Sequence, residues 1–409
     1  MAEIAEAGDA AAGRFACALG CQEHEEVLVQ AFEPWWDHLF ASAAIDRACR
    51  LMGEGYSQAF MGAISGGRVF WKCCSSRRGD CLPGAANLDG AEPNDRDVFL
   101  SLVAEVADAG ALPDMRFLFN TGDQPIPDRT YVSAVPQFHW VKSEGHWGIP
   151  LPNPFHLDAH FMDRLGDGAF FDKHMVPWEQ KVAKVFWRGS LSAPDKIVPE
   201  DVASLPRVRL MKLAAQHPDL FDVAITDVDE ELARSLGRGQ AKKLVRDLGM
   251  APRVDMSEQL PRHRYVINVS AVLSAWRLVQ LLASGSVVLL QADVNRELIH
   301  EWLTPWEHYV PVSNGLSDLV ARVRWLEGHP DEARAIAARG LDIFRRRVRR
   351  HDTYCYVWQA LRAMGRAAEP HSPGRPGDLA RKGWTEVVPG AAAGQAPLRG
   401  LLAGGGAEL

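Results

Sequence analysis

The chain has 409 residues, which is too long for one ordinary hydrophobic core, so two domains are expected. Hydrophobic residues make up 47% of the chain and charged residues 24%, as in a globular protein rather than a disordered or fibrous one. The formal net charge of -7 argues against a general nucleic-acid-binding protein. No apolar run is long enough for a membrane-spanning helix.

The two ends of the chain predict little regular structure. The first twenty residues contain two early acidic residues and no basic segment followed by an apolar run, so they do not predict a signal peptide. Beyond residue 368 the sequence turns to Pro, Gly and Ala, and we expect residues 368–409 to form a disordered tail. The basic run at 345–350 closes a long helical pattern, where cations complement the helix dipole.

Seven cysteines suggest an oxidising compartment. Cys81 could form a disulfide with Cys73 or Cys74 in one crowded loop, whereas Cys49 stands alone in the sequence. A zinc site at the N-terminal cysteines is not expected, because Cys17, Cys21 and His24 lack a second ligand pair.

The first part of the chain mixes helical and strand patterns. Next to the apolar strand pattern at 115–120, residues 121–125 form a sharp break. The helical patterns cover 25–32, 36–52, 56–64 and 98–109, and a strand pattern covers 68–71.

Asp123 lies directly after the strand pattern at 115–120. Ligands of α/β proteins collect beyond the carboxyl ends of strands, so Asp123 is a candidate catalytic residue. The alternative is an Asx turn before Pro125. The following stretch at 131–161 is irregular and rich in Pro, Trp, His and Phe, as in the covering of a cleft. Its two histidines at 156 and 160 lack a third ligand, so no metal site is predicted.

The second half alternates helix with strand, which indicates a doubly wound α/β domain. The predicted helices cover 171–182, 207–217, 239–248, 317–327, 330–350 and 354–364, and the predicted strands cover 184–187, 221–225, 265–269, 286–290 and 309–312.

The segment from 264 to 290 is the centre of this domain. Two short buried strands with a helix between them predict a parallel β-α-β crossover. We expect the helix to begin near Ser274 as its N-cap, with Arg277 in its first turn. Free backbone N–H groups and a guanidinium at this point favour an anionic ligand, most plausibly a phosphate.

Several motifs in this order and spacing resemble glycosyltransferase family 90. The family includes protein O-glucosyltransferases and fungal capsule-associated xylosyltransferases, and the resemblance covers roughly residues 110–366. The motifs that carry it are Leu118-Phe119-Asn120 with Gly122-Asp123-Gln124-Pro125, Trp187-Arg188-Gly189-Ser190, Ser274-Ala275-Trp276-Arg277, Ser284 to Leu289, and Leu303 to Val312.

The resemblance implies a GT-B-like α/β fold with two Rossmann-like domains facing across a cleft. It places an acceptor and base domain at 1–165, a nucleotide-sugar-binding domain at 166–351, and a C-terminal helix at 352–366 that crosses back to the first domain. It also implies an inverting enzyme that needs no metal. The enzyme would be a monomer and would act in the secretory lumen, in the endoplasmic reticulum or Golgi. The absent signal peptide keeps the cytoplasm as the alternative. Cys355 would pair with Cys17 or Cys21.

The resemblance also assigns roles to residues. Asp123 would take the proton of the acceptor hydroxyl, and Arg207 and Arg277 would hold the donor diphosphate. Glu297 would bind ribose or sugar hydroxyls, the alternative being a solvated helix face. The further donor-binding positions are Ser190, Val272, Ser274, Ala275 and Trp276. The acceptor groove would include Pro150, Asn153 and Phe155. The candidate disulfide cysteines are Cys74, Cys81, Cys21 and Cys355.

The sequence departs from the family pattern at one place. Ser270 and Ala271 follow the Asn-containing strand, where many members carry an acidic residue and a glycine. This leaves the donor sugar open between glucose and xylose. The acceptor, a protein or a glycan, is also open, because the residues of Pro150 to Phe155 differ from those of the glucosyltransferases. The alternatives to a UDP-sugar transferase are a non-catalytic sugar- or protein-binding member of the fold and a GT-B enzyme of another type, such as an epimerase.

Overall fold

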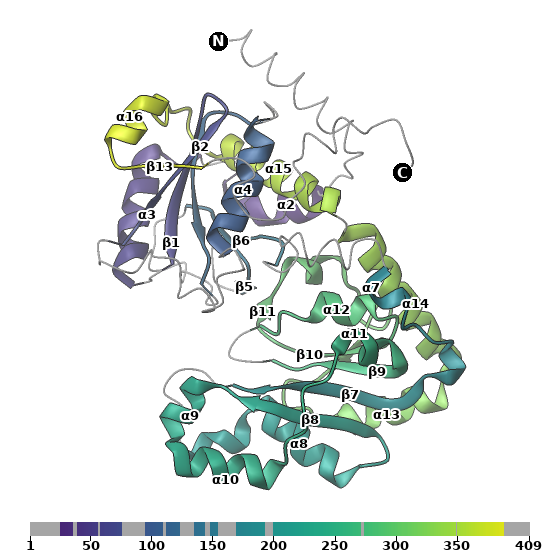
Figure 1. Ribbon diagram of the computed structural model, residues 1–409. Coiled ribbons are helices and arrows are strands. Elements are labelled where there is room, and N and C mark those ends of the chain that lie inside the picture. Colours follow the sequence, from purple (N-terminus) through teal and green to yellow (C-terminus); the bar gives the residue numbers. More distant parts are fainter. Residues whose placement is uncertain are drawn as a thin grey trace. The chain divides into compact units, whose positions relative to one another are not determined.

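The computed structural model describes residues 25–35, 39–55, 58–75, 95–108, 112–122, 135–143, 148–153, 169–192, 199–270, 274–348 and 350–387. The chain divides into two compact units (Figure 1). Unit 1 comprises Met1–Asp163, Arg296–Glu301 and Arg349–Leu409, and unit 2 comprises Arg164–Asn295 and Trp302–Val348. The α/β class expected from the sequence is confirmed, with a β-sheet covered by helices in each unit.

Unit 1 is built on a mixed six-stranded sheet in the order β13-β2-β1-β3-β4-β6. β1 runs antiparallel to β2 and β3, whereas β3, β4 and β6 are parallel to one another. The strands are β1 (Ala59–Ser65), β2 (Arg68–Cys73), β3 (Met115–Asn120), β4 (Gln137–His139), β6 (Gly148–Pro150) and β13 (Thr385–Glu386), with a short further strand β5 (Lys142–Ser143).

Helices cover both faces of this sheet, which explains the nearly continuous apolar sequence of β3. Phe117 and Phe119 pack against Phe99 of α4. Arg116 points to the opposite face and pairs with Asp46 of α3 at 3.1 Å. The helices of unit 1 are α2 (Glu25–Phe32), α3 (Ser42–Gly55), α4 (Asp95–Asp108), α15 (Arg350–Ala367) and α16 (Pro376–Arg381).

The helix predicted at 56–64 is wrong, because this segment forms β1. A short apolar run fits a buried strand as well as a buried helix. The hairpin with β2 settles it: Gly66 and Gly67 have φ of 57° and 74°, which a two-residue hairpin turn requires and which side chains disfavour.

The disordered tail predicted from residue 368 is corrected for its first part. Residues 376–381 form α16, and β13 pairs with β2. Trp384 and Leu379 are buried, and Glu386 pairs with Arg68. The burial of Trp384 and Leu379 and the pairing of β13 with β2 thus order a segment whose composition alone suggested disorder. Residues 388–409 lie outside the described part of the chain.

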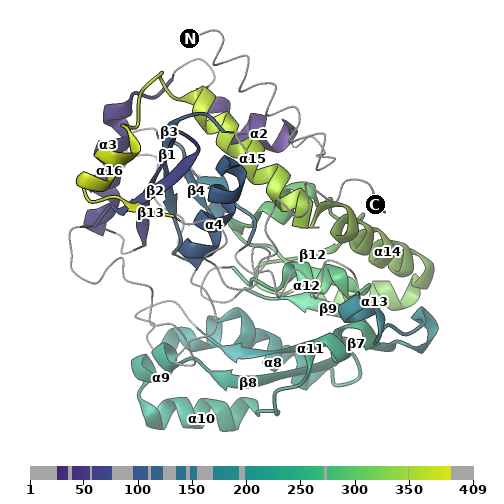
Figure 2. The same cartoon turned by 45° about the horizontal axis from the view of Figure 1, so that its top comes forward.

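Unit 2 is a doubly wound domain with a fully parallel sheet in the order β12-β10-β9-β7-β8. α12 lies over one face of this sheet and α8 and α10 over the other (Figures 1 and 2). The strands are β7 (Val182–Leu191), β8 (Phe221–Val228), β9 (His263–Asn268), β10 (Val287–Gln291) and β12 (Val310–Val312), and β11 (Asn295–Arg296) follows β10.

Four helices of unit 2, Pro206–Gln216, Arg238–Leu248, Leu319–Gly328 and Pro330–Arg347, lie close to predicted ones, whereas Glu230–Leu236 and Met256–Gln259 were not predicted. The helix predicted at 171–182 is wrong: α7 ends at Asp172, and Pro177 interrupts the helical pattern before β7 begins at Val182. The helices are α7 (Ala169–Asp172), α8 (Pro206–Gln216), α9 (Glu230–Leu236), α10 (Arg238–Leu248), α11 (Met256–Gln259), α12 (Leu278–Ala283), α13 (Leu319–Gly328) and α14 (Pro330–Arg347).

A buried lysine secures the C-terminal end of α12. Lys181 Nζ donates to the carbonyl oxygens of Ser284 and Gly285 at 3.2 and 3.0 Å and to Ser286 Oγ at 3.2 Å. Burial lowers the pKa of Lys181 to about 8. The three acceptors lie where a helix leaves its last carbonyls unpaired, so Lys181 joins α12 to the start of β10.

Candidate functional site

The carboxyl end of β7 positions a buried arginine. Arg207, in the first turn of α8, is 4% exposed, and its Nη1 donates to Ser190 O at 2.7 Å and Ser192 Oγ at 3.1 Å. Its Nε is buried without a hydrogen-bond partner among the described residues. The strand predicted to stop at Arg188 continues to Leu191, so the carbonyl of Ser190 belongs to the strand that holds Arg207.

A second guanidinium, that of Arg277, lies beside the same strand, and both guanidinium groups lie near the ring of Trp187. Arg277 Nη1 donates to the carbonyl oxygen of Arg188 at 2.5 Å. The guanidinium carbons of Arg207 and Arg277 lie 5.6 and 5.8 Å from the centroid of the Trp187 ring, which is 1% exposed. A Cβ on Gly189 would lie 3.1 Å from Arg277 Nη2 and 2.7 Å from the Trp187 ring. Gly189 therefore makes room for this arrangement.

The electrostatics of the two arginines are unfavourable for each other. Burial, together with the charge of Arg277, lowers the pKa of Arg207 to about 9, and burial lowers the pKa of Arg277. Within the described ranges, neither guanidinium has a carboxylate oxygen within 4 Å. Two neighbouring, partly desolvated cations without a counter-ion raise the energy of the fold, and an anion bound between them would offset that cost.

The turn before Arg277 differs from the predicted helix start. α12 begins at Leu278 with Arg277 at its N-cap position, where no side chain caps the helix, so the prediction of Ser274 as the N-cap is wrong. Ser274 and Ala275 are buried, and Trp276 is half-buried, in the turn that delivers Arg277 to the edge of the sheet. Because α12 has only six residues, the guanidinium side chains rather than a helix dipole carry the positive charge here. Val272 lies outside the described residues.

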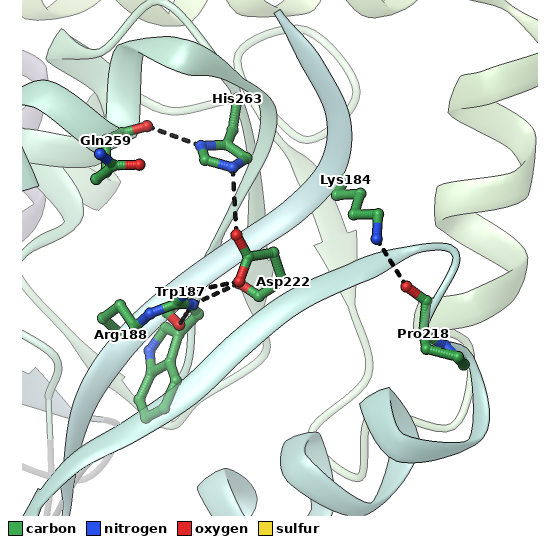
Figure 3. A network of polar contacts seen from close by, with 7 residues as sticks. All are labelled: Lys184, Trp187, Arg188, Pro218, Asp222, Gln259 and His263. Carbon is green, nitrogen blue, oxygen red and sulfur yellow. Dashed lines mark hydrogen bonds and ion pairs between the residues drawn. The ribbon is translucent and has the colours of Figure 1, made fainter. Parts of the chain in front are cut away.

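Arg188 itself faces away from the pair of arginines. Its Nη2 donates to Asp222 Oδ1 at 2.6 Å, and Asp222 Oδ2 lies 3.6 Å from His263 Nε2 (Figure 3). His263 Nδ1 donates to the carbonyl of Gln259 at 2.8 Å, and the ring stacks on Phe186. Arg188 therefore has a structural role, because its side chain links β7 to β8.

The predicted donor residue Glu297 belongs to unit 1 rather than to the sheet of unit 2. Its carboxylate accepts a 2.7 Å hydrogen bond from Asn153 Nδ2, and the two residues are each 1% exposed. The alternative of a solvated helix face is therefore wrong. The segment that carries Glu297 leaves the sheet of unit 2 after β10, a crossing that no local pattern in the sequence signals.

Pro150 and Asn153, predicted to line an acceptor groove, are buried inside unit 1. The carbonyl of Pro150 accepts a 2.7 Å hydrogen bond from Tyr356 of α15, and burial raises the pKa of that tyrosine. Their contacts fix the end of β6 against α15 and Glu297. Phe155 lies outside the described residues.

A polar network forms at the carboxyl ends of β3 and β4, just before the predicted base. Asn120 Oδ1 accepts from the backbone N–H of Gly122 at 2.7 Å and lies 3.0 Å from His139 Nε2. Because Oδ1 already accepts from Gly122, His139 Nε2 is the donor of the second bond. Thr121 N also donates to the carbonyl of Gln58 at 3.1 Å. Asp123, the next residue, lies outside the described part of the chain.

The cysteines pair differently from the prediction. Cys74 forms a disulfide with Cys49, so a Cys74–Cys81 bond is excluded. Strand β2 brings Cys74, which follows it, next to Cys49 of α3. The two cysteines are 25 residues apart along the chain, so spacing in the sequence did not indicate that they are neighbours. Cys73 and Cys355 are also disulfide-bonded. Cys17, Cys21 and Cys81, the partners proposed from the sequence, lie outside the described residues.

No group of three or more His, Cys, Asp or Glu side chains is arranged to hold a metal ion in the described ranges. Among the helices described, none combines the length and apolar character needed to cross a bilayer.

Comparisons with known proteins follow this geometry. The chain is 30% identical over 256 residues to Protein O-glucosyltransferase 2 of Danio rerio, covering 60% of this chain and 46% of the relative. It is 28% identical over 274 residues to Protein O-glucosyltransferase 3 of Homo sapiens, covering 65% and 48%. The chain thus spans about half the length of these curated relatives. It is also 24% identical to human Protein O-glucosyltransferase 1, covering 68% of each chain.

Solved structures give only distant likenesses. A glycosyltransferase from Rickettsia africae has a TM-score of 0.34 at 11% identity, covering 60% of this chain and 70% of that one. TarM has a TM-score of 0.33 at 11% identity, covering 46% and 36%. These scores are too low to support an inference about this chain. The model of glycosyl transferase family 90 matches residues 94–369, which is well over half of the sequence, and the chain therefore belongs to this family.

Proposed function

We propose that the protein is an inverting glycosyltransferase that moves a sugar from a UDP-sugar to a hydroxyl group of a protein or glycan. The observation that carries the proposal is the pair of guanidinium groups near the ring of Trp187, with no carboxylate within 4 Å in the described residues. A diphosphate is an anion of suitable charge for two arginines, and the pair lies at the carboxyl edge of a parallel sheet.

Arg207 and Arg277 would act on the leaving group. When the bond between the anomeric carbon and the diphosphate oxygen breaks, the electron pair stays with UDP, and negative charge grows on its terminal phosphate. Guanidinium groups that are already desolvated stabilise this charge more strongly than solvated ones would. Two fixed cations can therefore serve the leaving group without a bound metal ion, and we propose a metal-independent reaction.

Asp123 would act on the acceptor. It follows Gly122, whose N–H is held by Asn120 at the carboxyl end of β3. As base, its carboxylate would take the proton of the acceptor hydroxyl while that oxygen attacks the anomeric carbon from the side opposite UDP. Attack from that side inverts the configuration of the anomeric carbon.

Glucose is the first donor sugar to test, because the curated relatives are named protein O-glucosyltransferases. Xylose is the second. The Cys49–Cys74 disulfide supports a secretory lumen over the cytoplasm, where thiols are kept reduced.

Calorimetric titration with UDP tests the diphosphate site. Arg277→Ala should weaken UDP binding by about 1.5–3 kcal/mol, the range for a hydrogen bond to a charged group. Arg324→Ala is the matched control, because this exposed arginine of α13 pairs with Asp219 at the opposite edge of the sheet. Unchanged UDP affinity in Arg277→Ala would refute the site.

Turnover of UDP-glucose and UDP-xylose separates the enzyme from a non-catalytic binding protein. Asp123→Asn should retain UDP affinity and lose transfer and donor hydrolysis. Equal turnover by the wild type and Asp123→Asn would exclude Asp123 as the base, and no turnover of either donor by the wild type would favour a binding protein. Turnover in excess EDTA should equal turnover without it, and a loss on chelation would contradict the metal-independent reaction.

A further inference from the structure

A second polar cluster lies at the carboxyl edge of the unit 2 sheet, after β9 and β10. Ser270 N donates to Gln291 Oε1 at 2.9 Å, and Gln291 Nε2 donates to the carbonyl of Asn314 at 2.6 Å. Asn314 Nδ2 in turn donates to the carbonyl of Ala292 at 3.0 Å. These bonds connect the ends of three adjacent strands and give the edge a defined shape.

Asp293 is the acidic member of this cluster. The hydroxyl of Ser270 donates to Asp293 Oδ2, and the backbone N–H of Asn295 donates to Asp293 Oδ1 at 2.9 Å. Each carboxylate oxygen is thus held by one donor and keeps further accepting capacity. No Lys, Arg or His nitrogen lies within 4 Å of Asp293 in the part of the chain described. The carboxylate is oriented and half-buried, and no cationic side chain of the described residues neutralises its charge.

Asn268, the last residue of β9, adds a second acceptor two residues before Ser270. Asn268 is 6% exposed, and its buried Oδ1 has no hydrogen-bond partner among the described residues. A buried oxygen without a donor costs about 1–3 kcal/mol. The carboxylate of Asp293 and Oδ1 of Asn268 can therefore both accept hydrogen bonds from donors that the described residues do not supply.

Two parts of this sheet edge thus differ in charge and in hydrogen-bonding character. Arg207 and Arg277, beside β7, present donors with positive charge, whereas Asp293 and Asn268, at the ends of β10 and β9, present acceptors. Adjacent strands are about 4.8 Å apart, so β7 and β10 are separated by roughly 10 Å across β9. A ligand that spans them needs an anionic group at one end and hydroxyl groups at the other, as a nucleoside diphosphate sugar has.

We propose that Asp293, oriented by Ser270, binds a hydroxyl pair of the sugar nucleotide, on its ribose or on its transferred sugar, with Asn268 as a second acceptor. This inference rests on the proposed function. It moves the hydroxyl-binding role from Glu297 to Asp293, because the carboxylate of Glu297 is buried against Asn153 in unit 1.

Calorimetric titrations of wild type and Asp293→Asn with UDP and with UDP-glucose test the inference. Asp293→Asn removes a negative charge, so a purely electrostatic effect would strengthen the binding of these anions. We expect the opposite, a weakening of ten- to a hundredfold from lost charge-assisted hydrogen bonds. Weaker binding of both ligands identifies the ribose, and weaker binding of UDP-glucose alone identifies the transferred sugar.

Two further variants keep the test decisive. Ser270→Ala retains the carboxylate and loses only its orientation, so it should weaken the same ligand by a smaller factor. Asp219→Asn, on an exposed aspartate at the opposite edge of the sheet, should leave both affinities unchanged. Unchanged or tighter binding of both ligands to folded Asp293→Asn overturns the inference. If Arg277→Ala weakens UDP binding in the same series, the diphosphate site stands; if it does not, the proposed function itself fails.

Discussion

Asn120 and His139 occupy opposing positions on the parallel strands β3 and β4, and His139 Nε2 donates to Asn120 Oδ1 across a distance of 3.0 Å. The imidazole is fully buried, and its Nδ1 lies 3.0 Å from the backbone nitrogen of Val141, which donates to it. Asn120 Oδ1 also holds the N–H of Gly122. His139 of β4 therefore orients the side chain of Asn120 in β3, and Asn120 in turn holds the backbone N–H of Gly122, one residue before Asp123.

We expect His139→Leu to lower kcat by about tenfold or more, because the loss of one hydrogen bond frees the backbone before the base. The affinity for UDP should stay within about twofold of the wild type. His139→Gln can place an amide N–H near Asn120 and should recover most of the activity. Steady-state kinetics and UDP titrations check this. A His139→Leu enzyme with wild-type kcat, or one that loses UDP binding, would contradict the positioning role.

Gly189→Ala should damage the diphosphate site by sterics alone. The new Cβ would lie 2.7 Å from the buried ring of Trp187 and 3.1 Å from Arg277 Nη2, so the ring or the guanidinium must shift. We expect UDP affinity to fall about tenfold and stability to fall by about 1–3 kcal/mol. Titration and denaturant unfolding measure the two effects.

Gly239→Ala is the matched control for this substitution. A Cβ on Gly239, which lies in α10, has no atom within 4 Å, and alanine is the better helix residue. UDP affinity should be unchanged, and stability should rise slightly. Equal UDP affinities for Gly189→Ala and Gly239→Ala would show that the space beside Trp187 is not needed.

Acid should destabilise unit 2 through His263. Burial lowers the pKa of His263 below its usual 6.5, against the opposing effects of the Gln259 carbonyl and Asp222. Below pH 6.5 the unfolded state binds the proton and the folded state resists it, so stability falls as the pH falls through this range. Denaturant unfolding between pH 7.5 and 5 should show a smaller loss for His263→Phe than for the wild type.

Asp222→Asn should have the opposite effect to His263→Phe on the loss of stability in acid. The carboxylate of Asp222 raises the pKa of His263, so its removal should lower that pKa further and increase the loss of stability in acid. Asparagine can still accept the hydrogen bond from Arg188. Parallel pH profiles for the wild type, His263→Phe and Asp222→Asn would show that His263 is not the titrating group.

The Cys49–Cys74 disulfide should contribute to the stability of unit 1. It closes a loop of 25 residues between α3 and the end of β2, for which chain entropy predicts about 3 kcal/mol. The double variant Cys49→Ser with Cys74→Ser should unfold at lower denaturant concentration than the wild type in non-reducing buffer. An unchanged midpoint would mean that the packing of α3 alone holds the two segments together.

The sequence predicted which residues gather at the carboxyl end of β7, because this follows from local order along the chain. Residues at the ends of successive parallel strands meet at one edge, so Ser190, Arg207 and Arg277 converge as expected. The placement of Glu297 in unit 1 was not predicted, because its segment leaves the sheet of unit 2 and this depends on contacts rather than on a local pattern. The pairs Asn120–His139 and Ser270–Asp293 depend on which strands lie side by side and in which register, and spacing along the chain does not specify either.

The pairing of β13 with β2 has a consequence for self-association. β13 covers the outer side of β2, with Val387 N donating to the carbonyl of Val69 at 2.9 Å, and Arg68 and Glu386 pair across the two strands. A chain cut after residue 369 would expose the N–H and C=O groups of β2 as an open template for another chain. The C-terminal segment thus acts as a built-in guard against edge-to-edge aggregation of the unit 1 sheet.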